Sequence, residues 1–350
     1  RGRLLFAVSA AASSGALACA AGVAAEGSAA SAMEDEYGEM DDSGKTFHLP
    51  RFTTESGVTL HDVQLRYRTW GELNAERDNV LVVCHALTGN AALDDWWSSF
   101  LGDGLPFDTS KYYVICANLL GSCYGSTGPS SINPQTGEPY GATFPRLTVR
   151  DGVAVQKQMV RWGEGVKQVK CVIGGSLGGM QTVEWLFNDH YYTSEEDCKG
   201  QPEDCLRRPD PDDELGPQPF VRSAIPMACG THHHTWQIAV SEAQRQCIYA
   251  DPDFQDGAYY NTGREPKTGI GLARMQAMVS YRSHAAYEHK FGRRRIDPED
   301  GSDLPDDWQA GNPESETPFN APFSVETYLK YQGEKFHNRF DANSYITLTQ

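Results

Sequence analysis

The chain is poor in positive charge and has no long apolar run. Its 350 residues include 30 Lys and Arg against 47 Asp and Glu, which gives a formal net charge of -17. Because a field of that sign repels nucleic acid and anionic membranes, we expect neither as a partner, and an anionic ligand must be held by local groups. Residues 1–31 are apolar in part but diluted by Ser and Gly, which argues against a membrane span. Hydrophobic residues make up 39% of the chain, enough for a substantial core.

The nine cysteines do not show the spacing of a metal site. Several lie in apolar, strand-like runs, where a thiol acts as a small buried hydrophobe. We therefore expect reduced cysteines, with Cys198 and Cys205 as the one pair whose spacing would suit a disulfide. The consecutive His232, His233 and His234 have no acidic or Cys partner at ligand spacing, so we place them in a polar loop and expect no metal.

The N-terminal part differs in composition from the rest. Residues 1–31 are rich in Ala and Ser and reach their first acidic residue at Glu26, as in a targeting leader or a low-complexity, disordered terminus. Residues 33–45 are acidic and are predicted to be disordered. We assign 1–46 to a leader and acidic segment. A cytoplasmic location and transit to an organelle or secretion all stay open.

Apolar runs alternate with helical patterns up to Cys229. The run 58–71 alternates between apolar and polar residues and predicts a hairpin strand near an edge. Continuous apolar runs are typical of strands buried on both faces, and they occur at 79–84, 112–120, 166–173 and 220–229. Helical periods cover 148–163, where Thr148 and Asp151 resemble a capping box, and 179–187. This order predicts an α/β fold with a mainly parallel, doubly wound sheet over 47–233, in which 188–219 is a polar surface insertion.

After Cys229 the pattern becomes helical. Helical periods occur at 234–250, 271–291 and 324–336, and 292–320 is a charged loop. We assign 234–340 to a helical lid. Residues 341–350 begin another helix and are assigned to the start of a further part of the core.

The stretch CVIGGSLGGMQTVEW places Ser176 in a G-x-S-x-G pattern between a predicted strand and a predicted helix. In that context the serine adopts a strained backbone, its oxygen stands above the sheet, and the N–H of Leu177 lies at a helix N-terminus. The alternative is a glycine-rich turn with an incidental serine, which the strand and helix around it disfavour. The loop HALTGN after the run 79–84 would supply a second oxyanion donor, the N–H of Leu87, and we interpret His85 as a structural hydrogen-bonding residue.

Several long motifs, in this order, resemble the homoserine O-acetyltransferase family of α/β-hydrolase-fold acyltransferases. They are HALTGNAA, NLLGSCYGSTGPSSINPQTGEPYGATFPRLTVRD, GGSLGGMQTVEW, IPMACG, QRQCIYADPDFQDGAYY, GLARMQAMVSYRS and SYITLT. The resemblance runs from about Phe47 to Gln350, apart from the insertion and the charged loop. It is much more specific than the five-residue serine pattern alone.

The resemblance implies a two-step transfer in which Ser176 takes the acetyl group of acetyl-CoA and the hydroxyl of L-homoserine receives it, for methionine synthesis. It also implies a homodimer with no metal or bound prosthetic group. The family's substrate-facing arginine and tyrosine match Arg274 and Tyr281, which are two turns apart on one helical face, and a guanidinium can hold a carboxylate in a fork. A homoserine O-succinyltransferase, a serine O-acyltransferase, a deacetylcephalosporin-type acetyltransferase and a serine ester hydrolase of the same fold stay open as alternatives.

A nucleophilic serine also needs a general base and an orienting carboxylate. In this fold both follow the serine, on loops after later strands, and no strand is predicted after Cys229. In the family these motifs follow the SYITLT helix, so the resemblance implies that the catalytic Asp and His lie beyond residue 350 and that the chain is a fragment. We therefore expect an exposed strand edge, and we expect His284, His289 and His337 to lie away from Ser176.

Overall fold

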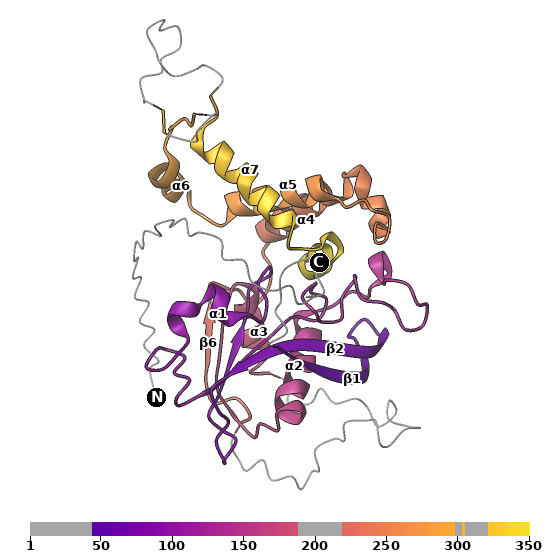
Figure 1. The fold of residues 1–350 in the computed structure, drawn as a ribbon, viewed down its shortest axis with the longest axis vertical. Coiled ribbons are helices and arrows are strands. Elements are labelled where there is room, and N and C mark those ends of the chain that lie inside the picture. The colour runs from indigo at the N-terminus through magenta and orange to yellow at the C-terminus, as the bar shows by residue number, and fades with distance from the viewer. Residues whose placement is uncertain (1–43, 188–218, 298–302, 305–320) are drawn as a thin grey trace, which may run out of the picture. The chain divides into compact units, whose positions relative to one another are not determined.

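The computed structural model describes residues 44–187, 219–297, 303–304 and 321–350, which belong to one compact unit (Figure 1). The expected leader up to residue 43, the insertion up to residue 218 and most of the charged loop lie outside the described residues. So do Cys198 and Cys205, and their pairing stays a prediction.

The described strands form one mixed sheet in the order β1-β2-β4-β3-β5-β6. Their bounds are β1 (Lys45–Thr53), β2 (Thr59–Trp70), β3 (Val80–Cys84), β4 (Tyr113–Ala117), β5 (Val169–Gly175) and β6 (Ala224–Met227). The hairpin β1–β2 is antiparallel and joins β4, whereas β4, β3, β5 and β6 run parallel. The predicted mainly parallel α/β sheet is confirmed, as is the hairpin at its edge.

Both faces of the central strands are covered, which explains their continuous apolar sequences. In β3, Val80 and Val82 belong to a core that includes side chains of α2 (Val149–Gln158). The alternate residues Leu81 and Val83 belong to a second core with Leu93 of α1 (Leu93–Trp96). The thiols of Cys84, Cys116 and Cys171 are buried in these strands, as predicted.

Helices α2 and α3 flank the parallel strands. The N-terminus of α2 carries the predicted capping box: Asp151 N donates to Thr148 Oγ1 (3.2 Å), and Thr148 N donates to Asp151 Oδ2 (2.9 Å). The helix continues as a π-helical turn that ends at Gly163. Helix α3 (Leu177–Glu184) contacts β3, β5 and β6, and it begins two residues before the predicted start because Ser176 is its N-cap.

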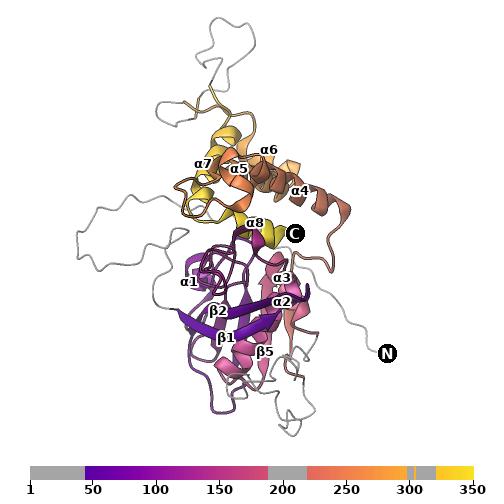
Figure 2. The same cartoon turned by 90° about the vertical axis from the view of Figure 1, so that its right-hand side faces the viewer.

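The second half of the described chain is helical. Its elements are α4 (Thr235–Tyr249), α5 (Lys267–Ser280), α6 (His284–Phe291), α7 (Ser324–His337) and α8 (Ala342–Thr349), with a short 3-10 segment at Pro252–Gly257. Two further 3-10 segments, Ser98–Phe100 and Gly141–Thr143, lie in the first half of the chain. Figures 1 and 2 both show α8 between the group α4–α7 and the sheet. The side chains of Tyr345 and Ile346 in α8 share a core with Ile248 of α4 and with Tyr124.

The single helical pattern predicted at 271–291 is wrong in one respect, because the structure divides it. Helix α5 ends at Ser280, and α6 begins after Ser283, whose Oγ accepts a hydrogen bond from Ala286 N (3.2 Å). A serine at that place satisfies the first N–H groups of a new helix and so ends the continuity of the old one.

At the far side of the described sheet, β6 is an edge strand with its apolar Ile225 50% exposed. Within the described residues, β5 is the only strand that pairs with β6. No helix in the part of the chain that the structure describes is both long and apolar enough to cross a bilayer.

Candidate functional site

Ser176 occupies a sharp turn between β5 and α3. Its backbone has φ 59° and ψ -124°, a region that favours glycine, and its N–H donates to Met227 O (3.0 Å). The residue is exposed, and within the described residues its Oγ has no hydrogen-bond partner. The predicted strand, strained turn and helix, with an accessible hydroxyl, are confirmed.

Two glycines of the motif, Gly174 and Gly178, are required by close backbone packing. A Cβ at Gly178 would lie 2.1 Å from Cys84 O, and a Cβ at Gly174 would lie 2.3 Å from Gly178 O. A Cβ at Gly175 would meet no atom within 4 Å. The motif therefore packs the start of α3 directly against the end of β3, and only the first and last glycines carry this contact.

The two candidate oxyanion donors lie on either side of this junction. Leu177 is the first residue of α3, where N–H groups have no intrahelical acceptor and positive partial charge accumulates. Leu87 lies between Ala86 and Thr88, which line the same cavity as Ser176. The side chain of Leu87 packs against the core of the helical part, and Leu177 lines a different cavity. An oxyanion role would thus be carried by the backbone N–H of each leucine.

His85 follows β3 and is buried, with 1% of its surface exposed. Its Nδ1 lies 2.8 Å from Ala86 O, and because a carbonyl only accepts, Nδ1 carries the proton. Burial lowers the pKa of His85 to about 4, so the imidazole is neutral near pH 7. The interpretation of His85 as a structural hydrogen-bonding residue agrees with this geometry. Its Nε2, however, has no partner within the described residues.

Of the histidines that the structure describes, only His85 lines the cavity of Ser176. His284, His289 and His337 do not, as expected. His232, His233 and His234 follow β6 and precede α4, and the rings of His232 and His234 lie 5.2 Å apart. Within the described ranges, no three His, Cys, Asp or Glu residues are grouped closely enough to hold a metal ion.

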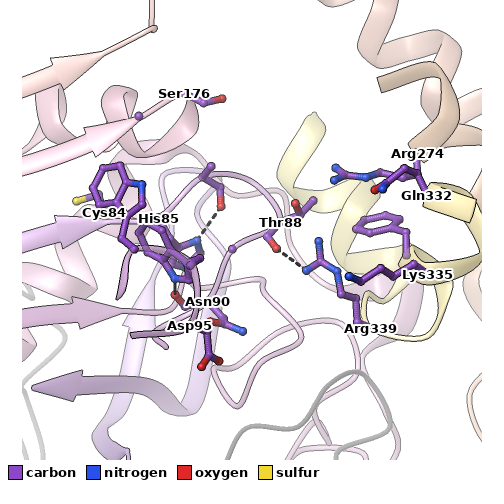
Figure 3. A pocket seen from close by; sticks show the side chains of 16 residues that line it. Cys84, His85, Thr88, Asn90, Asp95, Ser176, Arg274, Gln332, Lys335 and Arg339 are labelled. Carbon is purple, nitrogen blue, oxygen red and sulfur yellow. Dashed lines mark hydrogen bonds between the residues drawn. The ribbon is translucent and has the colours of Figure 1, made fainter. Parts of the chain in front are cut away.

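A cavity of about 890 Å³ separates the sheet side from the lid side of the site. Ser176, His85 and Thr88 line the sheet side. Figure 3 shows Arg274 of α5, Lys335 of α7 and Arg339, which follows α7, on the opposite side of the cavity. The lining also includes Asn90, Asp95, Trp96, Trp97, Gln332 and Phe336. Three cationic side chains face a single carboxylate, that of Asp95, in a chain whose net charge is -17. The cavity is thus suited to an anionic ligand.

Arg274 reaches this cavity from α5, but Tyr281 does not. The guanidinium carbon of Arg274 lies 5.0 Å from the ring centroid of Phe336 and 5.8 Å from that of Tyr281. Tyr281 is the C-cap of α5, is 55% exposed and does not line the cavity. The structure therefore brings Arg274 together with Ser176, and it places Tyr281 beside the arginine instead of beside the serine.

The sequence reasoning missed Lys335 and Arg339. Arg339 Nη1 donates to Thr88 O (3.0 Å) and to Tyr124 Oη (3.2 Å), while Tyr124 Oη donates to Arg339 O (2.6 Å). These bonds join the end of the lid to the loop that holds Leu87. The four-residue spacing of the two cations puts them on one side of α7 and its extension, but the sequence does not show which surface that side faces.

Comparison with known proteins agrees with this architecture. A family model described as "alpha/beta hydrolase fold" matches residues 79–188. The homoserine O-acetyltransferase of Chlorobium chlorochromatii is 42% identical over 299 residues, which cover 85% of this chain and 70% of that protein. The homoserine O-acetyltransferase of Salinibacter ruber is 41% identical over 306 residues, 87% of this chain and 74% of that protein.

Solved structures show the same fold. The crystal structure of homoserine O-acetyltransferase from Bacillus anthracis is 25% identical, with a TM-score of 0.66, and the match covers 87% of this chain and 74% of that one. The crystal structure of esterase E22 has a TM-score of 0.63 at 24% identity, covering 87% of this chain and 76% of that one. The identity to the two sequence relatives, over more than two thirds of their length, decides between the acyltransferase and esterase branches of the fold. The chain belongs to the homoserine O-acetyltransferase family and is an acyltransferase of the α/β-hydrolase fold.

Proposed function

We propose that this protein transfers the acetyl group of acetyl-CoA to the hydroxyl of L-homoserine through an acetyl-enzyme on Ser176. The observation that carries the proposal is one cavity that holds an exposed serine on a strained turn and, across from it, the guanidinium of Arg274, which makes no ion pair with the described residues. The relatives named homoserine O-acetyltransferase support the choice of acetyl donor and homoserine acceptor. The product, O-acetyl-L-homoserine, would serve methionine synthesis.

In the first step Ser176 Oγ attacks the thioester carbonyl, the S–C bond breaks, and CoA leaves as the thiol. The negative charge that develops on the carbonyl oxygen would be stabilised by the N–H groups of Leu177 and Leu87. Loss of one such donor typically costs about 3 kcal/mol of transition-state stabilisation. The partial positive charge at the N-terminus of α3 would add to this effect.

In the second step the hydroxyl of homoserine attacks the acetyl-enzyme and restores Ser176. Arg274 would hold the carboxylate of homoserine in a bidentate fork. Its cation–π contacts with Phe336 and Tyr281 would fix the guanidinium plane, which gives Tyr281 a supporting role in place of direct contact with the cavity. The acceptor would thus be oriented by a charge on the lid, opposite the nucleophile.

The test is to mix the full-length protein with acetyl-CoA or succinyl-CoA, with and without homoserine or serine, and to follow thiol release together with the intact protein mass. We expect thiol release from acetyl-CoA that requires homoserine, and an added acetyl group on the protein that Ser176→Ala abolishes. Equal thiol release without any amino acid would instead identify an ester or thioester hydrolase. A preference for succinyl-CoA or for serine would identify the succinyltransferase or serine acyltransferase alternatives.

A further inference from the structure

We propose that Lys335 and Arg339 form a second anion subsite in this cavity, which binds the phosphate groups of the acyl-CoA donor. This inference rests on the function proposed above and assigns residues to the donor end of the same site. It separates the site into two anion-binding places, with Arg274 for the amino-acid carboxylate and the end of α7 for the donor. Figure 3 shows the three side chains on the lid side of the cavity, which all three line.

The first argument is that these cations have no anionic partner. Within the described residues, Arg274, Lys335 and Arg339 make no ion pair, whereas arginines elsewhere in the chain do. Examples are Arg68 with Asp94 (2.9 Å) and Arg150 with Glu55 (2.8 Å). Three like charges around a cavity whose lining holds one carboxylate, that of Asp95, repel one another unless a ligand neutralises them.

The second argument is that the arrangement is held in place. Phe336 is buried, and its ring centroid lies 5.0 Å from the guanidinium carbon of Arg274 and 5.3 Å from that of Arg339. Arg339 is fixed further by Thr88 O and by Tyr124. Lys335 is exposed, and its ammonium has no hydrogen-bond partner in the described ranges. The subsite thus combines a fixed planar donor with a free, compact charge, both of which bind phosphate.

The third argument is a count of charges. A homoserine zwitterion presents one carboxylate, which a single guanidinium fork satisfies, so it cannot neutralise three cations. A CoA thioester carries a diphosphate and a 3′-phosphate at the end remote from the reacting carbonyl. Binding these groups on the lid would leave the thioester free to reach Ser176, and binding energy from this remote part of the donor would be used to orient the reacting part.

The test measures binding by titration calorimetry, so that it does not depend on turnover. The protein is titrated with CoA and, separately, with pantetheine, which lacks the phosphates. Lys335→Ala should weaken CoA binding roughly tenfold, the typical value of one charge-assisted contact, and should leave pantetheine binding unchanged. Lys335→Glu should weaken CoA binding further. The matched control is Lys330→Ala, an exposed lysine on the same helix that does not line the cavity, and it should bind CoA like the parent.

Three results would overturn the inference: no CoA binding by the parent protein, equal CoA affinity in Lys335→Ala, or an equal loss of pantetheine binding. Arg339→Lys is a second variant that keeps the charge. It should retain most of the phosphate affinity even though the bonds to Thr88 and Tyr124 weaken.

The test also separates this inference from the proposed function. If S-acetyl-pantetheine and acetyl-CoA acylate Ser176 equally well in the parent and in Lys335→Ala, the acyl transfer stands and the phosphate subsite fails. If CoA binding depends on Lys335 but thiol release never depends on homoserine, the subsite stands and the proposed acceptor is wrong.

Discussion

Replacing the motif glycines one at a time tests whether the turn at Ser176 depends on the close backbone contact between α3 and β3. In Gly178→Ala the new Cβ would lie 2.1 Å from Cys84 O, and contacts shorter than 3.0 Å are essentially never found, so α3 and β3 must separate by roughly 1 Å. The opposing atom is backbone of a central strand and cannot move aside as a side-chain tip could. Overpacking of this kind typically costs 1–3 kcal/mol, and we expect about 3 kcal/mol for this contact.

The assay is thermal unfolding of Gly174→Ala, Gly175→Ala and Gly178→Ala beside the parent protein. We expect Tm to fall by roughly 5 °C in Gly178→Ala and by a similar amount in Gly174→Ala, whose Cβ would meet Gly178 O at 2.3 Å. Gly175→Ala is the internal control, because its Cβ meets nothing within 4 Å and its φ is not positive, so Tm should stay the same or rise slightly. Equal destabilisation by all three alanines would refute the reasoning, as would a parent-like Tm in Gly178→Ala.

Three further predictions concern the residues around that turn. Ser176→Gly should unfold at a higher temperature than Ser176→Ala, because only glycine relieves the positive φ, a strain of about 1–3 kcal/mol; equal Tm values would contradict the strain. The pKa of His85 is lowered to about 4 in the folded protein, so between pH 6.5 and 4 the unfolded chain binds a proton at this residue and the folded chain does not. The free energy of unfolding should therefore fall by about 3 kcal/mol over that range. In His85→Asn, the free energy of unfolding measured in urea should lack this decrease with falling pH. A pH dependence like that of the parent would show that folding does not lower the pKa of His85. Arg339→Gln should lower the rate constant for acylation of Ser176 at a Tm close to that of the parent, because it removes the bond that holds Thr88 and the Leu87 loop. Acylation at the parent rate would rule out this positioning role.

The order of helices and strands in the core could be predicted because each element has a local sequence pattern. Continuous apolar runs such as 79–84 mark strands covered on both faces, and the pairing of Thr148 with Asp151 marks a helix start within four residues of sequence. The glycines around Ser176 are equally local, since a strained strand-to-helix turn restricts its immediate neighbours.

The break between α5 and α6 shows where such local signals become ambiguous. The helical period of 271–291 continues across it, and only the capping bond from Ala286 N to Ser283 Oγ reveals the new start. The family resemblance, through the motif GLARMQAMVSYRS, implied that Tyr281 faces the substrate together with Arg274. In the structure Tyr281 is the C-cap of α5 and lies beside the arginine, half-exposed and outside the lining of the cavity.

By itself the sequence determined the class of fold, the position of the strained serine turn and the family, because each depends on residues adjacent in the chain or on long ordered motifs. Only the tertiary structure decided that Lys335 and Arg339 face Ser176 across one cavity. That juxtaposition depends on how α7 packs through Phe336 and on the bond from Arg339 to Thr88, residues 251 positions apart in the chain. No local sequence pattern specifies a contact between residues so far apart in the chain. Only the folded structure therefore shows that the lining of the cavity is mainly cationic.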